Sequence, residues 1–279
     1  MIYSRPAGRI TTILFSTTRA TSQPDDARAF AAKAENIRRA YNEKFFDATK
    51  GTYATGSQAA NSIALVMGIV EPAHSNAALA SLVRDVESRD CQMTAGDIGF
   101  RYLLQALAQG GRSDLIYRMI NQDAKPGYGF MLKKGETSLT EAWDANLTTS
   151  HNHFMLGQIT EWFYKDLAGI DCDASGPGFK KIIIKPTPVG DLTWVKASYD
   201  SVRGKITSEW KRDNSTFKLS VTIPPNTTAT VWLPSTSAED VKENGRRLDG
   251  LPGVKLLRHE NGYTLLSVES GQYDFESGH

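Results

Sequence analysis

The stretch GETSLTEAWDANLTTSHNHFMLGQITEWFYKDLAGI, residues 135–170, links a polar loop to the last helical pattern of the chain. From Asn152 to Ala168 apolar residues recur at helical spacing, and Gly169 follows as a helix stop. Beyond Gly178 apolar residues alternate with polar ones, which indicates β-strands. This change of period predicts a helical domain followed by a β domain.

Five more helices are predicted upstream of this stretch. Apolar residues at steps of three and four mark the first, from Pro24 to about Phe46. The next four cover residues 58–67, 72–86, 98–108 and 112–122, and the segment 126–129, with Tyr128, is predicted to be a loop. The segment 58–67 is apolar nearly all round, as expected of a helix inside a bundle or barrel.

The C-terminal part has the pattern of an antiparallel β-sandwich. Turn signals separate short runs rich in Val, Ile, Thr and Trp, and these runs cover residues 181–186, 192–199, 202–211, 217–223, 228–233 and 263–268. Such a domain could bind sugar on one face or act as a structural buttress. The buttress is favoured because Trp194, Trp210 and Trp232 lie inside strand patterns, where packing in the core is the default.

The composition limits the classes of partner. Thirty-two basic and thirty-one acidic residues leave a formal charge of +1, which does not favour nucleic acid or a membrane surface. Cys91 and Cys172 have neither disulfide-framework nor zinc-site spacing, so that no metal or cofactor is predicted. No apolar run is long enough for a membrane span or a signal peptide, which predicts a cytoplasmic protein.

The first 23 residues differ from the rest of the chain. They contain Arg5, Arg9 and Arg19 among many Ser and Thr residues and have no acidic residue, which is typical of transit peptides. A non-native or shifted start is the plainer interpretation, because helical periodicity begins only at Pro24.

The loop before the last helix combines residue types that suit sugar chemistry. Glu141 lies next to Trp143 in this loop, and His151 and His153 follow shortly afterwards. Aromatic rings stack on the apolar faces of sugars, and carboxylates transfer the protons. A sugar-processing pocket is therefore to be sought around Glu141.

Four segments resemble the C-terminal portion of bacterial α-L-rhamnosidases of glycoside hydrolase family 78. They read YNEKFFDATKGTYATGSQAANSIALVMGIV (41–70), MTAGDIGFRYLLQALAQGG (93–111), GETSLTEAWDA (135–145) and SHNHFMLGQITEWFYKDLAGI (150–170). The resemblance implies part of an (α/α)6 barrel of the six-hairpin glycosidase type, over residues 24–171. It also implies a C-terminal β-sandwich over residues 178–279.

The resemblance also implies a mechanism and a set of site residues. The family's mechanism is inverting, with one carboxylic acid protonating the leaving oxygen and one carboxylate activating water. By motif position Glu141 would be the general base, and His153 would contact the sugar hydroxyls. The other candidates for substrate binding are Trp143, Asp144, Tyr128 and Asp97. The substrate would be a rhamnose-containing oligosaccharide or glycoside.

This sequence departs from the family pattern in ways that affect the site. Thr140 stands where the family usually has Trp, and Tyr128 stands near a common Trp position. Nothing in residues 1–40 resembles the family's segment with the general acid, which predicts a truncated form of a longer enzyme. The alternatives are a catalytically inactive remnant or accessory carbohydrate-binding module, or a half-barrel to which another chain supplies the acid. Unpartnered helix faces would then favour self-association.

Each candidate residue also has a structural interpretation. Glu141 could be a surface residue, His153 a capping or core histidine, and Trp143 part of the barrel core. Capping of the helix from Ile98 is the favoured role for Asp97, and Asn152 could be an N-cap. Glu161, inside the last helix, is expected to form a structural ion pair.

Overall fold

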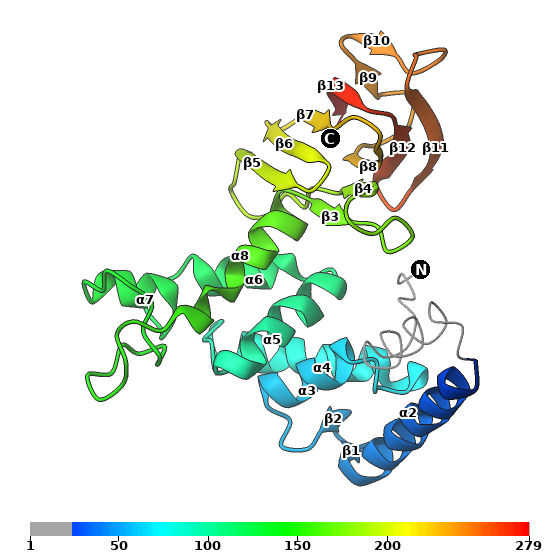
Figure 1. Cartoon of the computed structure of the whole chain (residues 1–279). Coiled ribbons are helices and arrows are strands. Elements are labelled where there is room, and N and C mark those ends of the chain that lie inside the picture. Colours follow the sequence, from blue (N-terminus) through cyan, green and yellow to red (C-terminus); the bar gives the residue numbers. More distant parts are fainter. Residues whose placement is uncertain (1–23, 279) are drawn as a thin grey trace. The chain divides into compact units, whose positions relative to one another are not determined.

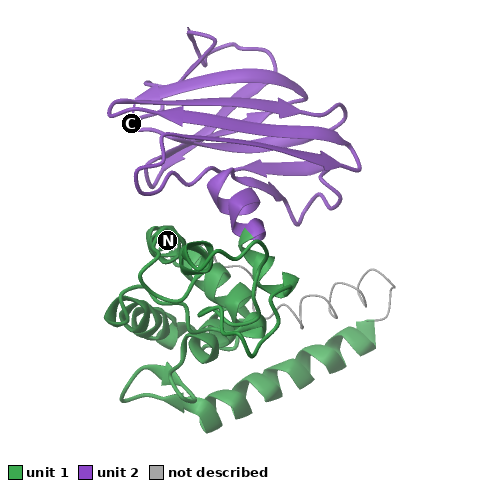
Figure 2. Ribbon diagram, turned by 90° about the vertical axis from the view of Figure 1, so that its left-hand side faces the viewer, with its two compact units in different colours: residues 1–159 green, residues 160–279 purple. Residues whose placement is uncertain are grey.

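The computed structural model describes residues 24–278 and contains two compact units, residues 1–159 and 160–279 (Figures 1 and 2). The first unit is helical and the second consists largely of β-sheets, in the order predicted. The expectation for residues 1–23 lies outside the described residues. None of the helices among residues 24–278 is both long and apolar enough to cross a membrane.

The helical unit contains one long helix and several short ones. Its elements are α2 (Pro24–Phe45), β1 (Phe46–Asp47), β2 (Thr52–Tyr53), α3 (Gln58–Val66), the 3₁₀ helix η1 (Pro72–His74), α4 (Ser75–Ser88), α5 (Asp97–Gln109), α6 (Ser113–Ile120), α7 (Tyr128–Lys133) and the 3₁₀ helix η2 (Phe154–Gln158).

Two predictions for this unit were wrong. The segment 126–129 is not a loop throughout, because α7 begins at Tyr128. The Pro126-Gly127 pair that indicated a turn instead precedes a helix start, where the Gly127 carbonyl accepts the Met131 N–H at 3.0 Å. The helix predicted from Asn152 to Ala168 begins only at Phe154, and it is not a regular α-helix. The chain there forms η2, the short α8 (Ile159–Trp162) and the π-helical η3 (Phe163–Leu167).

Buried amide side chains connect α3 to the neighbouring loops. Asn61 accepts the N–H of Tyr53 at 2.9 Å and donates to the carbonyl of Gly56 at 3.1 Å. Gln58, equally buried, donates to the carbonyl of Gln92 and accepts the N–H of Thr94. These bonds satisfy backbone groups that would otherwise be buried without partners.

α3 and α5 approach closely because a glycine lies between them. A Cβ at Gly99 of α5 would lie 2.6 Å from the Cβ of Ala59 in α3. Any larger residue at position 99 would push the two helices apart. Gly99 therefore sets the distance between α3 and α5, and α5 is the helix that begins at Asp97.

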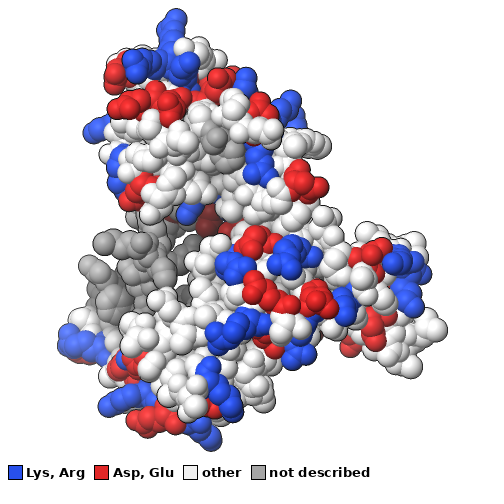
Figure 3. All heavy atoms as spheres, turned by 180° about the vertical axis from the view of Figure 1, so that it is seen from behind, with Lys and Arg blue, Asp and Glu red and all other residues white. Residues whose placement is uncertain are grey.

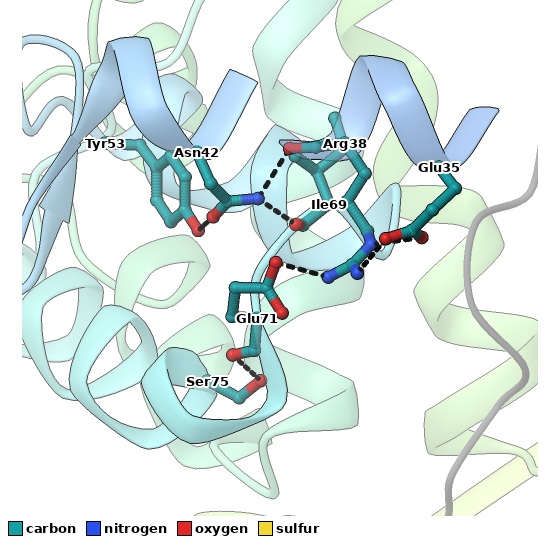
Figure 4. A network of polar contacts seen from close by, with 7 residues as sticks. All are labelled: Glu35, Arg38, Asn42, Tyr53, Ile69, Glu71 and Ser75. Carbon is teal, nitrogen blue, oxygen red and sulfur yellow. Dashed lines mark hydrogen bonds and ion pairs between the residues drawn. The ribbon is translucent and has the colours of Figure 1, made fainter. Parts of the chain in front are cut away.

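A polar network holds the C-terminal half of α2 (Figure 4). Asn42 donates to the carbonyl of Ile69 at 2.7 Å and accepts the hydroxyl of Tyr53. Arg38 pairs with Glu35 in its own helix and with Glu71 at 2.6 Å. Burial raises the pKa of Tyr53 to about 12. The bonds from Asn42 and Arg38 fasten α2 to the segment between α3 and η1.

The second unit is a two-sheet sandwich. The six-stranded sheet has the order β10-β9-β13-β7-β6-β5 and the five-stranded sheet the order β11-β12-β8-β4-β3. Among the described strands of the sandwich, all neighbouring pairs are antiparallel except β4 with β8, which is parallel. The strands are β3 (Ile170–Cys172), β4 (Lys181–Ile184), β5 (Trp194–Ser201), β6 (Gly204–Arg212), β7 (Thr216–Ile223), β8 (Thr228–Pro234), β9 (Lys242–Glu243), β10 (Arg246–Arg247), β11 (Val254–Glu260), β12 (Tyr263–Val268) and β13 (Gly271–Gly278).

The sandwich contains strands that the sequence pattern did not reveal. β9 and β10 have two residues each, too few for an alternating pattern, and most residues of β11 are exposed. β13 begins and ends at glycine and pairs with β7 along its whole length.

The three tryptophans of the sandwich have different environments. Trp210 and Trp232 are buried, as expected for core packing. Trp194 is 62% exposed, so that the prediction of core packing was wrong for this residue. It lies in β5 at the edge of its sheet, where β6 is the single neighbouring strand among the described residues.

Candidate functional site

Residues 136–153 form a loop between α7 and η2, which we name the Glu141 loop. Two backbone hydrogen bonds join its arms: His153 N–H donates to the Leu139 carbonyl at 2.7 Å, and Glu141 N–H donates to the Ser150 carbonyl at 2.8 Å. The bonded residues are two positions apart on the first arm, Leu139 and Glu141, and three positions apart on the second arm, Ser150 and His153. They bring Glu141 and His153 to the same end of the loop.

The Glu141 side chain is both oriented and exposed. Its Oε2 accepts the backbone N–H of Ser150 at 3.1 Å, and the residue is exposed to solvent. Within residues 24–278 no hydrogen bond is found to Oε1. The carboxylate thus has one oxygen held by the backbone and one available to water, an arrangement that suits a proton acceptor.

A histidine–carboxylate pair links the two arms of the Glu141 loop. His151 Nδ1 lies 2.7 Å from Oε2 of Glu136, and its Nε2 lies 3.3 Å from the carbonyl oxygen of Asn146. The hydrogen bond to Glu136 raises the pKa of His151. Sequence reasoning missed Glu136, because the two residues are 15 positions apart and no local spacing connects them.

Asp97 and His153 come together from different parts of the helical unit. Oδ2 of Asp97 lies 3.7 Å from Nε2 of His153, close enough for an ion pair when the imidazole is protonated but too long for a hydrogen bond. Within the described chain, Nε2 of His153 has no hydrogen-bond partner. Asp97 is the first residue of α5, and its carboxylate accepts the N–H of Ile98 at 2.8 Å. The predicted capping role was wrong, because Gly96 is the N-cap and no side chain caps this helix start.

Trp143 and Tyr128 belong to a cluster of aromatic rings. Their ring centroids lie 5.2 Å apart, and each ring meets Phe100 edge to face. Trp143 is buried, and its indole N–H donates to the carbonyl of Ala95 at 2.8 Å. The Tyr128 hydroxyl donates to the carbonyl of Leu156, and burial raises its pKa. These contacts favour the core interpretation of Trp143 over stacking on a sugar.

The remaining candidates have distinct positions. Asp144 is exposed in the Glu141 loop, whereas Thr140, at the family's Trp position, is buried and donates to the Ala142 carbonyl. The predicted N-cap at Asn152 was wrong, because His153 is the residue before η2 and makes no side-chain cap. Glu161 pairs with Lys165 at 3.1 Å, as predicted.

Residues 24–278 contain no group of three or more His, Cys, Asp or Glu side chains that could hold a metal ion. Basic and acidic side chains are interspersed on the face shown in Figure 3.

Family models match nearly the whole chain. The bacterial alpha-L-rhamnosidase 6 hairpin glycosidase domain matches residues 8–167, and the bacterial alpha-L-rhamnosidase C-terminal domain matches residues 169–247. The change of model at residues 167–169 differs from the division into compact units after Ile159. The domain boundaries at residues 171 and 178 stay predictions.

Individual relatives agree with the family models. An alpha-L-rhamnosidase of Streptomyces avermitilis is 30% identical over 266 residues, which cover 92% of this chain and 25% of that protein. One from Formosa agariphila is 25% identical, with coverage of 91% and 28%. The chain therefore spans about a quarter of the length of these relatives.

Solved structures support the fold. The S. avermitilis alpha-L-rhamnosidase complexed with L-rhamnose has a TM-score of 0.86 and 27% identity, over 95% of this chain and 26% of that chain. The enzyme from Dictyoglumus thermophilum has a TM-score of 0.85 and 28% identity, over 95% and 30%. The prediction of helices of the six-hairpin glycosidase type followed by a β-sandwich is confirmed, and the chain belongs to the bacterial alpha-L-rhamnosidase family.

Proposed function

We propose that Glu141 is the general base of an inverting α-L-rhamnosidase and that this chain carries the base-containing portion of a longer enzyme. The single observation that carries the proposal is the state of the Glu141 carboxylate, which the Ser150 N–H orients while it stays exposed to solvent. A general base must contact the water that it activates and must point in a defined direction.

The inverting mechanism assigns a separate task to each of two carboxyl groups. One carboxylic acid protonates the leaving oxygen while Glu141 removes a proton from the attacking water on the opposite face of the sugar. The two groups are roughly 6.5 to 9.5 Å apart in such enzymes, which leaves room for the water. The longer enzyme would supply the acid, because the chain spans about a quarter of its relatives.

A terminal α-L-rhamnose of an oligosaccharide or glycoside is the proposed substrate. The L-rhamnose complex of the S. avermitilis relative supports this choice. His153, whose Nε2 has no hydrogen-bond partner within the described residues, and Asp97 beside it would contact the sugar hydroxyls. Asp144, exposed on the same loop as Glu141, would contribute a further polar contact, and Trp143 with Tyr128 would support the loop from the core.

The alternative is a catalytically inactive remnant or an accessory carbohydrate-binding module. It is favoured by the pairing of three other candidate carboxylates: Asp97 lies against His153, Glu136 against His151, and Glu161 against Lys165. Each of these three carboxylates already lies against a basic side chain, which leaves none of them free to act as a second catalytic group. In a second variant of this alternative, a separate chain supplies the acid and restores turnover.

Hydrolysis of an aryl α-L-rhamnoside by the full chain tests the proposal. Glu141→Gln keeps the shape of the side chain but removes the base, so that kcat should fall by about a hundredfold to ten-thousandfold. Glu43→Gln, which removes an exposed carboxylate of α2, should leave kcat unchanged. The first anomer released should be β-L-rhamnose, as seen by proton NMR during the first turnovers.

Three outcomes would contradict parts of the proposal. Release of α-L-rhamnose first would exclude inversion, and full activity of Glu141→Gln would exclude the assigned base. No turnover above background at any pH would contradict activity of this chain alone, and would fit an acid supplied by the longer enzyme or by another chain as well as an inactive remnant. The cytoplasmic location stays a prediction from the sequence.

A further inference from the structure

The three tryptophans of the sandwich differ in what covers their rings. Trp210 stacks on Phe217 with centroids 5.7 Å apart, and its N–H donates to the Leu167 carbonyl at 2.8 Å. Trp232 carries the ammonium group of Lys185 4.6 Å above its ring. Trp194, in contrast, is 62% exposed. Within residues 24–278 its indole makes no hydrogen bond, ring stacking or cation contact.

The strand register places Trp194 on the outer face of the six-stranded sheet. Val195 of β5 lies opposite Trp210 of β6, and Trp210 points into the core. Because successive side chains point to opposite faces, Trp194 and its partner Lys211 lie on the outer side. β5 is an edge strand of this sheet, and no strand of residues 24–278 pairs with it on the side away from β6.

The outer face around Trp194 is polar and balanced in charge. On β5, β6, β7 and β13 the register brings four lysines and four carboxylates to this side, and two of the lysines are held in ion pairs 2.9 and 3.1 Å long. A balanced face does not favour an anionic ligand over a neutral one. The eight residues are Lys196, Asp200, Lys205, Glu209, Lys211, Lys218, Asp274 and Glu276.

We propose that this face binds a neutral saccharide, one sugar residue of which stacks on the indole of Trp194. An open indole offers a flat apolar surface that matches the C–H face of a pyranose ring. The hydroxyl groups at the rim of the sugar can accept hydrogen bonds from Lys211 and donate them to Glu209, on the neighbouring strand. Trp194 belongs to the second unit and Glu141 to the first, and binding at Trp194 does not require turnover at Glu141.

Electrophoresis of the folded full chain through native gels tests this site. The gels contain a neutral rhamnan, a neutral galactomannan or, as an acidic comparison, polygalacturonate. At least one neutral polysaccharide should retard the chain, and Trp194→Ala should weaken its apparent affinity about tenfold. Trp194→Phe, which keeps a smaller ring, should retain part of the retardation.

Tyr199→Ala is the matched control. Tyr199 is also exposed on β5, but it lies on the other side of the strand and contacts Phe179 and Tyr164. The Tyr199→Ala variant should be retarded as strongly as the wild-type chain. Thermal melts of all variants verify folding. The proposal is overturned if no neutral polysaccharide retards the wild-type chain, if only polygalacturonate does, or if Trp194→Ala is retarded as strongly as wild type.

Discussion

The two compact units differ in how completely their elements bury their apolar residues. In the sandwich, every second side chain of β7 is buried, and β6 shows the same alternation from Ile206 to Trp210. In the helical unit, the 22-residue α2 has a clear apolar stripe but only one buried residue, Ala27, while Phe30 and Ile37 are exposed. Apolar periodicity shows which face a helix would bury, and burial itself requires a partner surface.

Substitution of a buried sandwich tryptophan should have the largest effect. Trp210→Ala removes a ring that is 1% exposed and its hydrogen bond to Leu167, and should lower the free energy of unfolding by about 3–5 kcal/mol. Trp194→Ala, at an exposed position of the edge strand β5, should lower the free energy of unfolding by no more than about 0.5 kcal/mol. Urea titrations of both variants measure the contrast. Equal losses would show that Trp194 is buried in solution.

A buried amide of the helical unit comes next in size. Asn61→Ala removes the hydrogen-bond partner of the Tyr53 N–H and of the Gly56 carbonyl, and should lower the free energy of unfolding by about 1–3 kcal/mol. Because the contacts of Asn61 lie within the helical unit, its melting transition should move and that of the sandwich should not. Differential scanning calorimetry resolves the two. A parallel shift of both transitions would mean that the units unfold as one.

The His151–Glu136 pair should make the Glu141 loop sensitive to pH. The hydrogen bond to Glu136 raises the pKa of His151 above its ordinary value of about 6.5. Its stabilising contribution is therefore complete below about pH 6.5 and is lost as the pH rises through the raised pKa.

Glu136→Gln removes the carboxylate from this pair. The variant should be less stable than wild type at pH 5.5, with the difference shrinking by pH 8.5, and the NMR titration of His151 should move to lower pH. Asp144→Asn neutralises an exposed carboxylate of the same loop and should leave this titration in place. An unchanged titration in Glu136→Gln would exclude the pairing in solution.

The smallest effect on stability is expected on the open face of α2. Ile37→Ser replaces a side chain that is 56% exposed and should change the free energy of unfolding by no more than about 0.5 kcal/mol. Its effect should appear in association, because the sequence predicts that unpartnered barrel helices favour self-association. Light scattering should show a smaller average mass for the variant. A monomeric wild-type chain would count against self-association through this face.

Much of the fold could be predicted from local patterns, and the errors have identifiable causes. The helix α5 and the strands from β5 to β8 follow clear periods of 3.6 and two. α7 escaped because Pro126 and Gly127 indicate a turn as readily as a helix start. β9 and β10 are too short to have a period.

Residues of the candidate site could be predicted from the sequence only where they matched a family motif. The motif pointed to Glu141, and the structure adds the Ser150 N–H that orients its carboxylate. Glu136 was not predicted as a site residue, because its partner His151 lies on the opposite arm of the loop. Trp143 was ambiguous in the sequence, since an indole suits both a sugar platform and a core, and its contacts with Phe100 favour the core.

The sequence by itself determined that helices are followed by strands, with the change of period seen beyond Gly178, the family of the chain and the position of Glu141, because periodicity and short motifs are local properties. Only the tertiary structure decided which groups face each other. It joined Asp97 to His153, covered Trp232 with Lys185 and left Trp194 open. The physical reason is that burial and pairing depend on residues distant in the chain, and no local pattern records which of them will meet.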